Sequence, residues 1–241
     1  MKNTDKKILE IIENIEGYLT NKEAIFLFEL AQKCTDSGVI VEIGSYKGKS
    51  TICLGKGSKS GKNVKVYSID PHTGTKKWQN ERKVEIWSYD QFNKNIKKAG
   101  VDDIVIPIVK TSENAGLDFN KPVELIFIDG DHQYDLVKLD FDIWFPKLID
   151  GGIMLFHDSD WSGPSRVIIN KIYRSRYFRN VGFVESITFA EKVSKNSMKD
   201  RLSNYFNFMI WKNRKLVGSP IKRIVPNSLR KYLKGFISKV F

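Results

Sequence analysis

Two kinds of segment alternate along this chain. In one, apolar residues follow one another almost continuously, as in a buried strand. In the other they recur every three or four positions, as in an amphipathic helix. The strands expected are Val39–Ile43, Val64–Ile69, Asp103–Val109, a strand beginning at Val123, Ile153–Phe156, Val181–Thr188 and Asn204–Trp211. The helices expected are residues 5–17, Asn21–Lys33 capped by Asn21, the segment after Lys49, Gln91–Ala99, Asp135–Leu148 and Pro164–Tyr177.

The strand that begins at Val123 has an almost continuous apolar sequence, VELIFI. Such a strand is typical of a parallel sheet covered on both faces. The pattern therefore predicts an α/β fold, a doubly wound sheet with helices on both faces. In the helix Asp135–Leu148 we expect Leu136 and Trp144 on the inner side. The polar segment Thr75–Ser88 is expected to be a loop or a short helix. Glu191–Leu202 is expected to be a loop that could act as a lid.

A glycine-containing loop follows the first strand, in the sequence GVIVEIGSYKGKST. Gly44 and Gly48 are expected where the backbone turns with positive φ or approaches a ligand closely. The helix that follows offers unpaired N–H groups, so the loop suits a small polar or anionic ligand. It is not a phosphate-binding P-loop, because Ile43 stands where that motif has its first glycine, and G-x-G-x-x-G is also absent. An ordinary turn that needs glycine only for its geometry is the alternative.

Acidic and imidazole side chains follow three later strands. Asp70 ends the next apolar run, where doubly wound folds place ligand contacts, although it could also cap a turn before Pro71. Asp129, Asp131 and His132 follow one buried strand, and His157, Asp158 and Asp160 follow another. Clustered carboxylates repel one another unless a proton, a basic group or a divalent cation compensates them. Oxygen ligands suit Mg²⁺, and His132 could accept a proton near neutral pH.

Five blocks carry a resemblance to a known family: IGSYKGKST, SIDPHTG, FIDGDHQYD, GGIMLFHD and SGPSRVI. They resemble class I S-adenosylmethionine (SAM) dependent methyltransferases of the group that includes macrocin-type sugar O-methyltransferases. The group is more distantly similar to catechol O-methyltransferase. The resemblance covers about Val39 to Phe189. It implies a Rossmann-like, mostly parallel seven-stranded sheet with one antiparallel strand in the final hairpin.

The resemblance also implies a cofactor and site residues. SAM would bind with its methionine part over the glycine turn, its ribose at Asp70 and its adenine near Ser112. The cofactor-binding residues expected are Glu42, Gly44, Ser45, Gly48, Ser50, Asp70, Ser112, Glu113 and Asp129. In metal-dependent members the metal ligands map to Asp129, Asp158 and Ser159, and the general base maps to His132. Ser159 departs from the family, which has Asp or Asn there. Backbone hydrogen bonding is the alternative role for Asp158, and simple packing is the alternative for His157.

The composition is ordinary except for an excess of basic residues toward the C-terminal end. The chain has 241 residues, 41% hydrophobic and 28% charged, which is ordinary for a globular protein. Cys34 and Cys53 have no metal-type spacing, which favours a reduced, cytoplasmic setting. No apolar run is long enough to span a bilayer. The net charge of +12 arises in residues 161–241, which carry 18 Lys and Arg against 3 Asp and Glu.

The chain divides into residues 1–36, an N-terminal helical cap, residues 37–212, the catalytic domain, and residues 213–241, a basic tail. The tail has eight basic residues, no acid and an amphipathic pattern. It could contact a membrane surface peripherally, or pack on the protein itself or on a second subunit. The N-terminal helices could likewise join two subunits of a homo-oligomer.

The function expected is O-methylation of a hydroxyl on a small molecule, with a sugar or glycan as acceptor. A non-catalytic SAM- or glycan-binding module on the same fold is the first alternative. An RNA methyltransferase is the second, prompted by the basic end. Nucleic acid is disfavoured as a partner, because no aromatic and basic RNA-binding signature is present.

Overall fold

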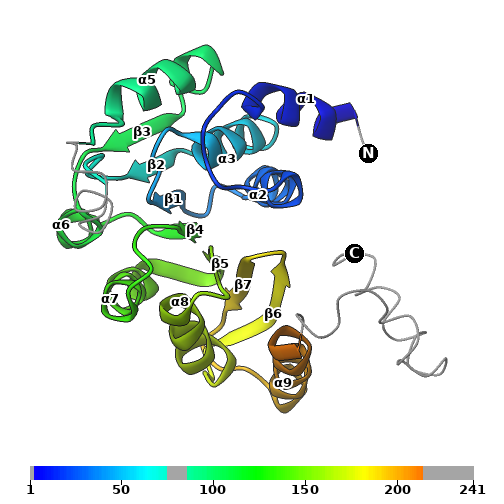
Figure 1. The fold of residues 1–241 in the computed structure, drawn as a ribbon. Coiled ribbons are helices and arrows are strands. Elements are labelled where there is room, and N and C mark those ends of the chain that lie inside the picture. Colours follow the sequence, from blue (N-terminus) through cyan, green and yellow to red (C-terminus); the bar gives the residue numbers. More distant parts are fainter. Residues whose placement is uncertain (1–2, 75–85, 214–241) are drawn as a thin grey trace.

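The computed structural model describes residues 3–74 and 86–213, and in them seven strands form one sheet in the order β3-β2-β1-β4-β5-β7-β6 (Figure 1). The strands are β1 (Val39–Ile43), β2 (Val66–Ile69), β3 (Val105–Ile108), β4 (Val123–Ile128), β5 (Leu148–Phe156), β6 (Phe178–Val184) and β7 (Ile187–Lys192). Strand β7 pairs antiparallel with both of its neighbours, and the pairings from β3 to β5 are all parallel. The predicted Rossmann-like sheet is confirmed.

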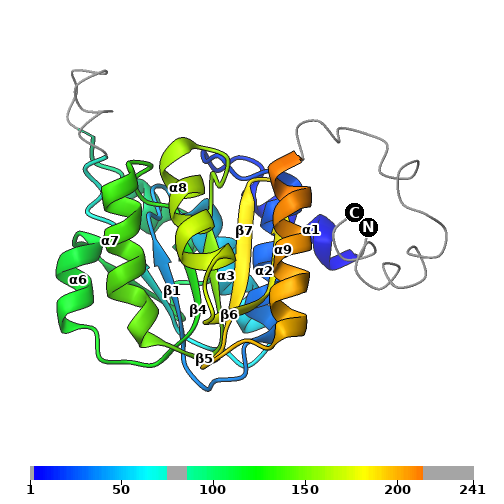
Figure 2. The ribbon, with the colours of Figure 1, turned by 90° about the horizontal axis from the view of Figure 1, so that it is seen from below.

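Helices cover both faces of this sheet (Figure 2). One face packs against α1 (Asn3–Ile12), α2 (Asn21–Lys33), α3 (Lys49–Lys59) and α5 (Tyr89–Lys98). The other packs against α6 (Ser112–Asp118), α7 (Tyr134–Trp144), α8 (Ser162–Val167) and a π-helix at Ile168–Tyr173. Helix α9 (Met198–Asn213) lies along the edge strand β6 (Figure 1). The two N-terminal helices share a hydrophobic core with β1 and β2, so they are part of the helical layer.

The register of the parallel strands brings the candidate site residues together. Ile43 pairs with Ile69 on one side and with Ile128 on the other, and Ile128 pairs with Phe156. The residues that follow these strand ends are therefore neighbours at one edge of the sheet. These are Gly44, Asp70, Asp129 and His157.

Several predicted boundaries differ from the structure. Helix α1 ends at Ile12, and Thr20 rather than Asn21 is the N-cap of α2, where its side chain and that of Glu23 form a reciprocal capping box. Helix α7 ends at Trp144 and a 3₁₀ turn at Phe145–Lys147 follows, because Pro146 cannot continue the helical hydrogen bonding. Leu148 instead begins β5, and Leu136 is 41% exposed rather than inward-facing.

The prediction of a strand at Asn204–Trp211 is wrong, because these residues belong to α9. The second strand of the final hairpin is β7, which begins where Val181–Thr188 was expected to end. Glu191–Leu202 is not a lid, since it contains the end of β7 and the start of α9. The segment Thr75–Ser88 lies mostly outside the described residues, as does the tail after Asn213.

Gly44 is required by close backbone packing. Its φ is +84°, and a Cβ atom there would lie 2.2 Å from the carbonyl oxygen of Asp129. The Gly44 N–H donates to the Ile69 carbonyl and the Asp129 N–H donates to the Ile43 carbonyl. The ends of β1, β2 and β4 thus meet at this glycine. Any side chain at this position would push the strand ends apart.

We predict that Gly44→Ala destabilises the fold far more than Gly151→Ala. Both glycines have a φ of +84°, but a Cβ at Gly151 has no atom within 4 Å. Gly151→Ala should therefore cost only the left-handed backbone strain, about 1–2 kcal/mol. Gly44→Ala should cost roughly 2 kcal/mol more, because overpacking is added. Urea unfolding of the two variants measures the difference, and equal losses would contradict the packing argument.

Candidate active site

The glycine loop is held by the carboxylate of Asp70. One oxygen of Asp70, Oδ2, accepts hydrogen bonds from the backbone N–H groups of Ser45 and Tyr46, each at 2.8 Å. The other oxygen, Oδ1, accepts from the N–H of His72 at 2.6 Å. Gly48, with a φ of +88°, is the N-cap of α3. Asp70 thus lies beside the loop as predicted and fixes its shape, and ribose binding by the same carboxylate stays a prediction.

Glu42 and Ser50 lie beneath this loop. Glu42 is completely buried, and its carboxylate accepts hydrogen bonds from Ser68 at 2.7 Å and from Thr51. Burial raises the pKa of Glu42 to about 7, against the opposing effect of hydroxyls that include Ser50. These groups support the loop from below. The hydroxyl of Ser45, by contrast, is buried without a hydrogen-bond partner among the described residues, so it is available to a ligand.

Ser112 and Glu113 begin α6, after Thr111 as its N-cap. The Ser112 hydroxyl accepts a hydrogen bond from the indole N–H of Trp144 at 2.8 Å. It also hydrogen-bonds the buried Asp140, whose pKa burial raises to about 6. Glu113 is exposed. The Ser112 side chain is therefore occupied within the protein, and a contact from either residue to adenine stays a prediction.

A buried ionic group surrounds His157, which is 4% exposed. Its Nδ1 lies 3.0 Å from Asp129 Oδ1 and 3.4 Å from Asp158 Oδ2, and its Nε2 lies 3.6 Å from Glu23 Oε2. Burial alone would lower the pKa of His157, but Asp129 first, and then Asp158 and Glu23, raise it to about 12. His157 is therefore a buried cation between three carboxylates rather than a simply packed side chain.

Glu23 is the member of this group that comes from the N-terminal helix α2. It is 1% exposed, and one of its oxygens accepts from both the N–H and the hydroxyl of Ser186, in the turn between β6 and β7. Burial would raise its pKa, but the nearby imidazolium of His157 and the hydrogen bonds from Ser186 lower it to about 2. Sequence reasoning missed this role. The T-x-x-E pattern could have placed Glu23 in a helix cap, but nothing local indicated its partner.

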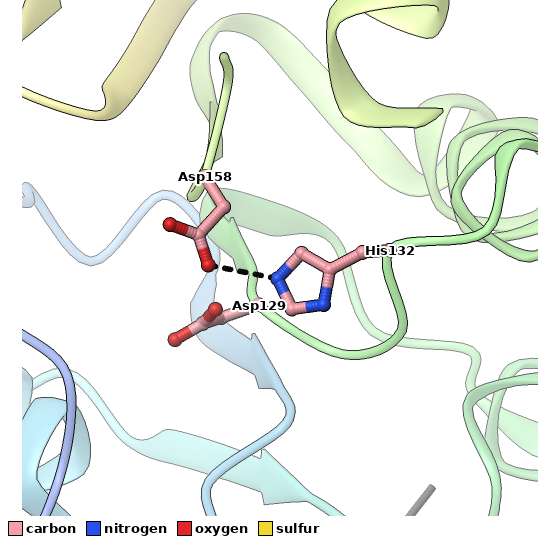
Figure 3. A group of neighbouring side chains, drawn as sticks. All are labelled: Asp129, His132 and Asp158. Carbon is pink, nitrogen blue, oxygen red and sulfur yellow. Dashed lines mark hydrogen bonds and ion pairs between the residues drawn. The ribbon is translucent and has the colours of Figure 1, made fainter. Parts of the chain in front are cut away.

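His132 is joined to this group through Asp158 (Figure 3). Its Nε2 is 2.8 Å from Asp158 Oδ2, and its ring packs on Trp161 with a centroid separation of 4.6 Å. The hydrogen bond with Asp158 raises the pKa of His132. Burial would raise the pKa of Asp158, but the hydrogen bonds with His132 and His157 hold it far below its usual range. The imidazole is therefore fixed in orientation by a carboxylate.

Asp129, His132 and Asp158 point toward one another, and one ligand atom from each lies within 4.8 Å of the others. The Asp129 side chain is 23% exposed, and burial raises its pKa. Ser159 is fully buried, and its hydroxyl has no hydrogen-bond partner in the described part of the chain. The two carboxylates suit a hard divalent cation, and Ser159 as a further ligand stays a prediction. His157 already compensates part of their charge, so the cluster does not depend on a metal.

The sequence profile of a family described as "Methyltransferase domain" matches residues 41–159. Residues 41–159 form a methyltransferase domain. The matched range begins in β1 and ends at Ser159, and it includes the glycine loop and the whole acidic group except Glu23.

One sequence relative and two solved structures are similar to this chain. An uncharacterized protein of Acanthamoeba polyphaga mimivirus is 31% identical over 142 residues, which are 57% of this chain and 60% of that protein. The structure of an O-methyltransferase from Bacillus cereus in complex with SAH has a TM-score of 0.55 at 19% identity, over 80% of this chain and 92% of that one. A rRNA methylase from Streptococcus thermophilus has a TM-score of 0.51 at 13% identity, over 74% and 100%. The fold is therefore shared by enzymes with different acceptors.

We predict that the three histidines of this protein respond differently to pH. Burial lowers the pKa of His72, Asp158 raises that of His132, and the surrounding carboxylates raise that of His157. In ¹H–¹³C spectra of untagged protein, His157 should not titrate between about pH 6 and 9, while His132 should have its midpoint above 6.5 and His72 below it. Because the pKa of His157 is higher in the folded state, its stabilising effect is complete below about pH 6.5 and declines as the pH rises.

Single substitutions assign the signals and test the causes. His157→Gln should remove the signal that does not titrate, and Asp158→Asn should lower the midpoint of His132 by about one unit. A midpoint near 6.5 for His157 would contradict the buried ionic group.

Proposed function

We propose that this protein is a SAM-dependent O-methyltransferase that methylates a hydroxyl group of a small molecule of the sugar or glycan class. The observation that carries the proposal is the position of the His132–Asp158 pair, at the same sheet edge as a glycine loop within a methyltransferase domain. A proton acceptor beside a nucleotide-type loop suits transfer to a hydroxyl, which must lose its proton.

The glycine loop and its surroundings would bind the cofactor. When bound, SAM supplies a methyl group on a positively charged sulfur. The backbone of Gly44 and the unpaired hydroxyl of Ser45 would contact its methionine part, Asp70 its ribose, and Asp129 would add negative charge near the sulfonium. The Bacillus cereus O-methyltransferase, which has this fold and contains SAH, supports the assignment.

His132 would act as the general base. Its Nε2–H donates to Asp158, which leaves Nδ1 as the proton acceptor, and Trp161 restricts the ring. The hydroxyl proton would pass to Nδ1 of His132 as the acceptor oxygen takes the methyl group, and the cofactor would leave as a neutral thioether. Positioning of the two reactants accounts for the remaining rate enhancement.

A divalent cation such as Mg²⁺ is proposed as an additional ligand of Asp129 and Asp158, with Ser159 as a third donor. When bound, it would lower the pKa of the acceptor hydroxyl and orient it. The unpaired hydroxyl of Ser159 and the grouping of the carboxylates support this.

The acceptor class rests on the likeness of the sequence blocks to sugar O-methyltransferases and on the charge of the site. Asp129 and Asp158, with Asp131 and Asp160 nearby in sequence, give this edge a negative character. Such an edge disfavours the phosphate backbone of RNA, which binds to basic surfaces. The rRNA methylase with the same fold makes RNA the control acceptor in the experiment below.

Labelled methyl transfer tests the proposed reaction. With methyl-labelled SAM, the wild-type protein should label a cell-envelope extract or nucleoside-diphosphate sugars and leave RNA unlabelled. His132→Ala should lower the rate by about 10²–10⁴-fold, because general-base catalysis is lost. Asp129→Asn should lower both the rate and the SAM affinity. Asp135→Asn, an exposed position on α7, is the control and should behave as wild type.

Calorimetry with SAM separates the enzyme from the binding module. His132→Ala should keep a dissociation constant for SAM close to that of the wild type. A wild-type protein that binds SAM but labels none of the fractions would support the non-catalytic alternative, and one that does not bind SAM would overturn the proposal.

We predict that EDTA reduces methyl transfer and that Mg²⁺ restores it. Calorimetric titration with Mg²⁺ in the absence of acceptor should show binding to the wild type and none to Asp158→Asn, because one carboxylate ligand is lost. Transfer that is unaffected by EDTA would leave the methyltransferase assignment intact and remove the metal from it.

A further inference from the structure

The buried side of α9 carries two asparagines beside Trp211. Asn204 and Asn207 are buried and hydrogen-bond the backbone of β6: the Asn204 carbonyl oxygen accepts from the Val181 N–H at 3.3 Å, its amide donates to Phe178 O at 2.9 Å, and Asn207 donates to Val181 O at 2.8 Å. These bonds satisfy backbone groups of an edge strand, which would otherwise be open to pairing with another chain.

The opposite side of α9 is apolar and faces solvent. Five residues form this apolar stripe: Met198 (73% exposed), Leu202 (67%), Tyr205 (63%), Phe206 (44%) and Met209 (41%). At about 3.6 residues per turn they span roughly 100° of the helix surface. Amphipathic helices of globular proteins have the reverse arrangement. A contiguous exposed apolar surface of this kind indicates an interaction site.

Basic residues flank the apolar stripe on both sides. On the helical projection Lys199 lies beyond one margin and Arg201 and Lys212 lie beyond the other. Asp200, the one acid of α9, hydrogen-bonds Ser197 and does not interrupt the apolar stripe. The chain after α9 adds eight Lys and Arg and no acid. The partner of this surface should therefore have both apolar groups and negative charge.

Three other partners would match the apolar stripe and its basic flanks less well. A second copy joined by α9 across a two-fold axis would bring the basic flanks of both helices together. The chain's own residues 214–241 would place eight further cations against Lys199, Arg201 and Lys212. Nucleic acid would meet the positive charge, but it offers no aliphatic surface for Met198, Leu202 and Met209. Anionic lipid supplies both properties.

We propose that α9 is an interfacial membrane-binding helix, with the apolar stripe inserted at the boundary between headgroups and acyl chains of an anionic bilayer. Its flanking cations and the basic residues that follow would contact lipid phosphates. No helix in residues 3–74 and 86–213 has the length and apolar content needed to cross a membrane. The contact proposed is peripheral because α9 would lie in the interface, and it is independent of the reaction proposed above.

Vesicle sedimentation of the full chain tests this proposal. The wild type should bind vesicles of phosphatidylcholine with about 30% phosphatidylglycerol, and should bind pure phosphatidylcholine vesicles weakly, since each basic residue near an anionic surface adds to the attraction. The double variant Leu202→Gln with Phe206→Gln should lower the partition coefficient by about tenfold or more, because two side chains no longer leave water. Leu117→Gln on α6, where Leu117 is 76% exposed, is the matched control and should bind as wild type.

Two further measurements distinguish membrane binding by the apolar stripe from dimerisation through it. Thermal unfolding should show that the double variant is folded, and sedimentation velocity should show that the wild type is not held together as a dimer by the apolar stripe. The proposal is overturned if the wild type ignores anionic vesicles or if the double variant binds them as the wild type does. It is also overturned if the substitutions dissociate a wild-type dimer.

Discussion

The structure depends on one buried cation. His157 follows the interior strand β5 and lies between Glu23, Asp129 and Asp158, where its own imidazole is shielded from water. A buried charge left without a partner is strongly destabilising, so the imidazolium of His157 and the carboxylates around it depend on one another. It joins α2, the ends of β4 and β5, and, through Ser186, the turn between β6 and β7. The N-terminal helix is thereby joined to the site.

This arrangement also shapes the chemistry available at the sheet edge. His157 contacts one oxygen of Asp129 and Oδ2 of Asp158, and the same Oδ2 atom orients His132. The two carboxylates can therefore lie close together without a metal, and their remaining oxygens can still accept one. A base with a fixed ring, next to a loop built on Gly44, suits proton removal from a hydroxyl during methyl transfer. Acceptor choice is a separate property, because the same fold occurs in enzymes that act on different molecules.

Helix α9 shows that polarity along a helix does not always follow burial. Its buried side carries Asn204 and Asn207 because the backbone of the edge strand β6 requires hydrogen-bond partners. Its apolar side is consequently left outside, beside a basic end of the chain. The location of the protein in the cell and the reaction that it performs would then be determined by different parts of the molecule.

The sequence alone determined the features that are encoded locally. Apolar runs predicted the parallel strands, and the spacing of Gly44, Asp70, Asp129 and Asp158 predicted that their positions meet, because the ends of neighbouring parallel strands lie at one edge. Tertiary structure alone decided which residues pair. Glu23 and His157 lie far apart in the chain, and no local pattern links them. The strand expected at Asn204–Trp211 is a helix because its polar residues satisfy another strand's backbone. The periodicity of apolar residues depends only on residues close together in the chain. The partners of a buried charge or of a buried backbone group are determined by how distant segments pack.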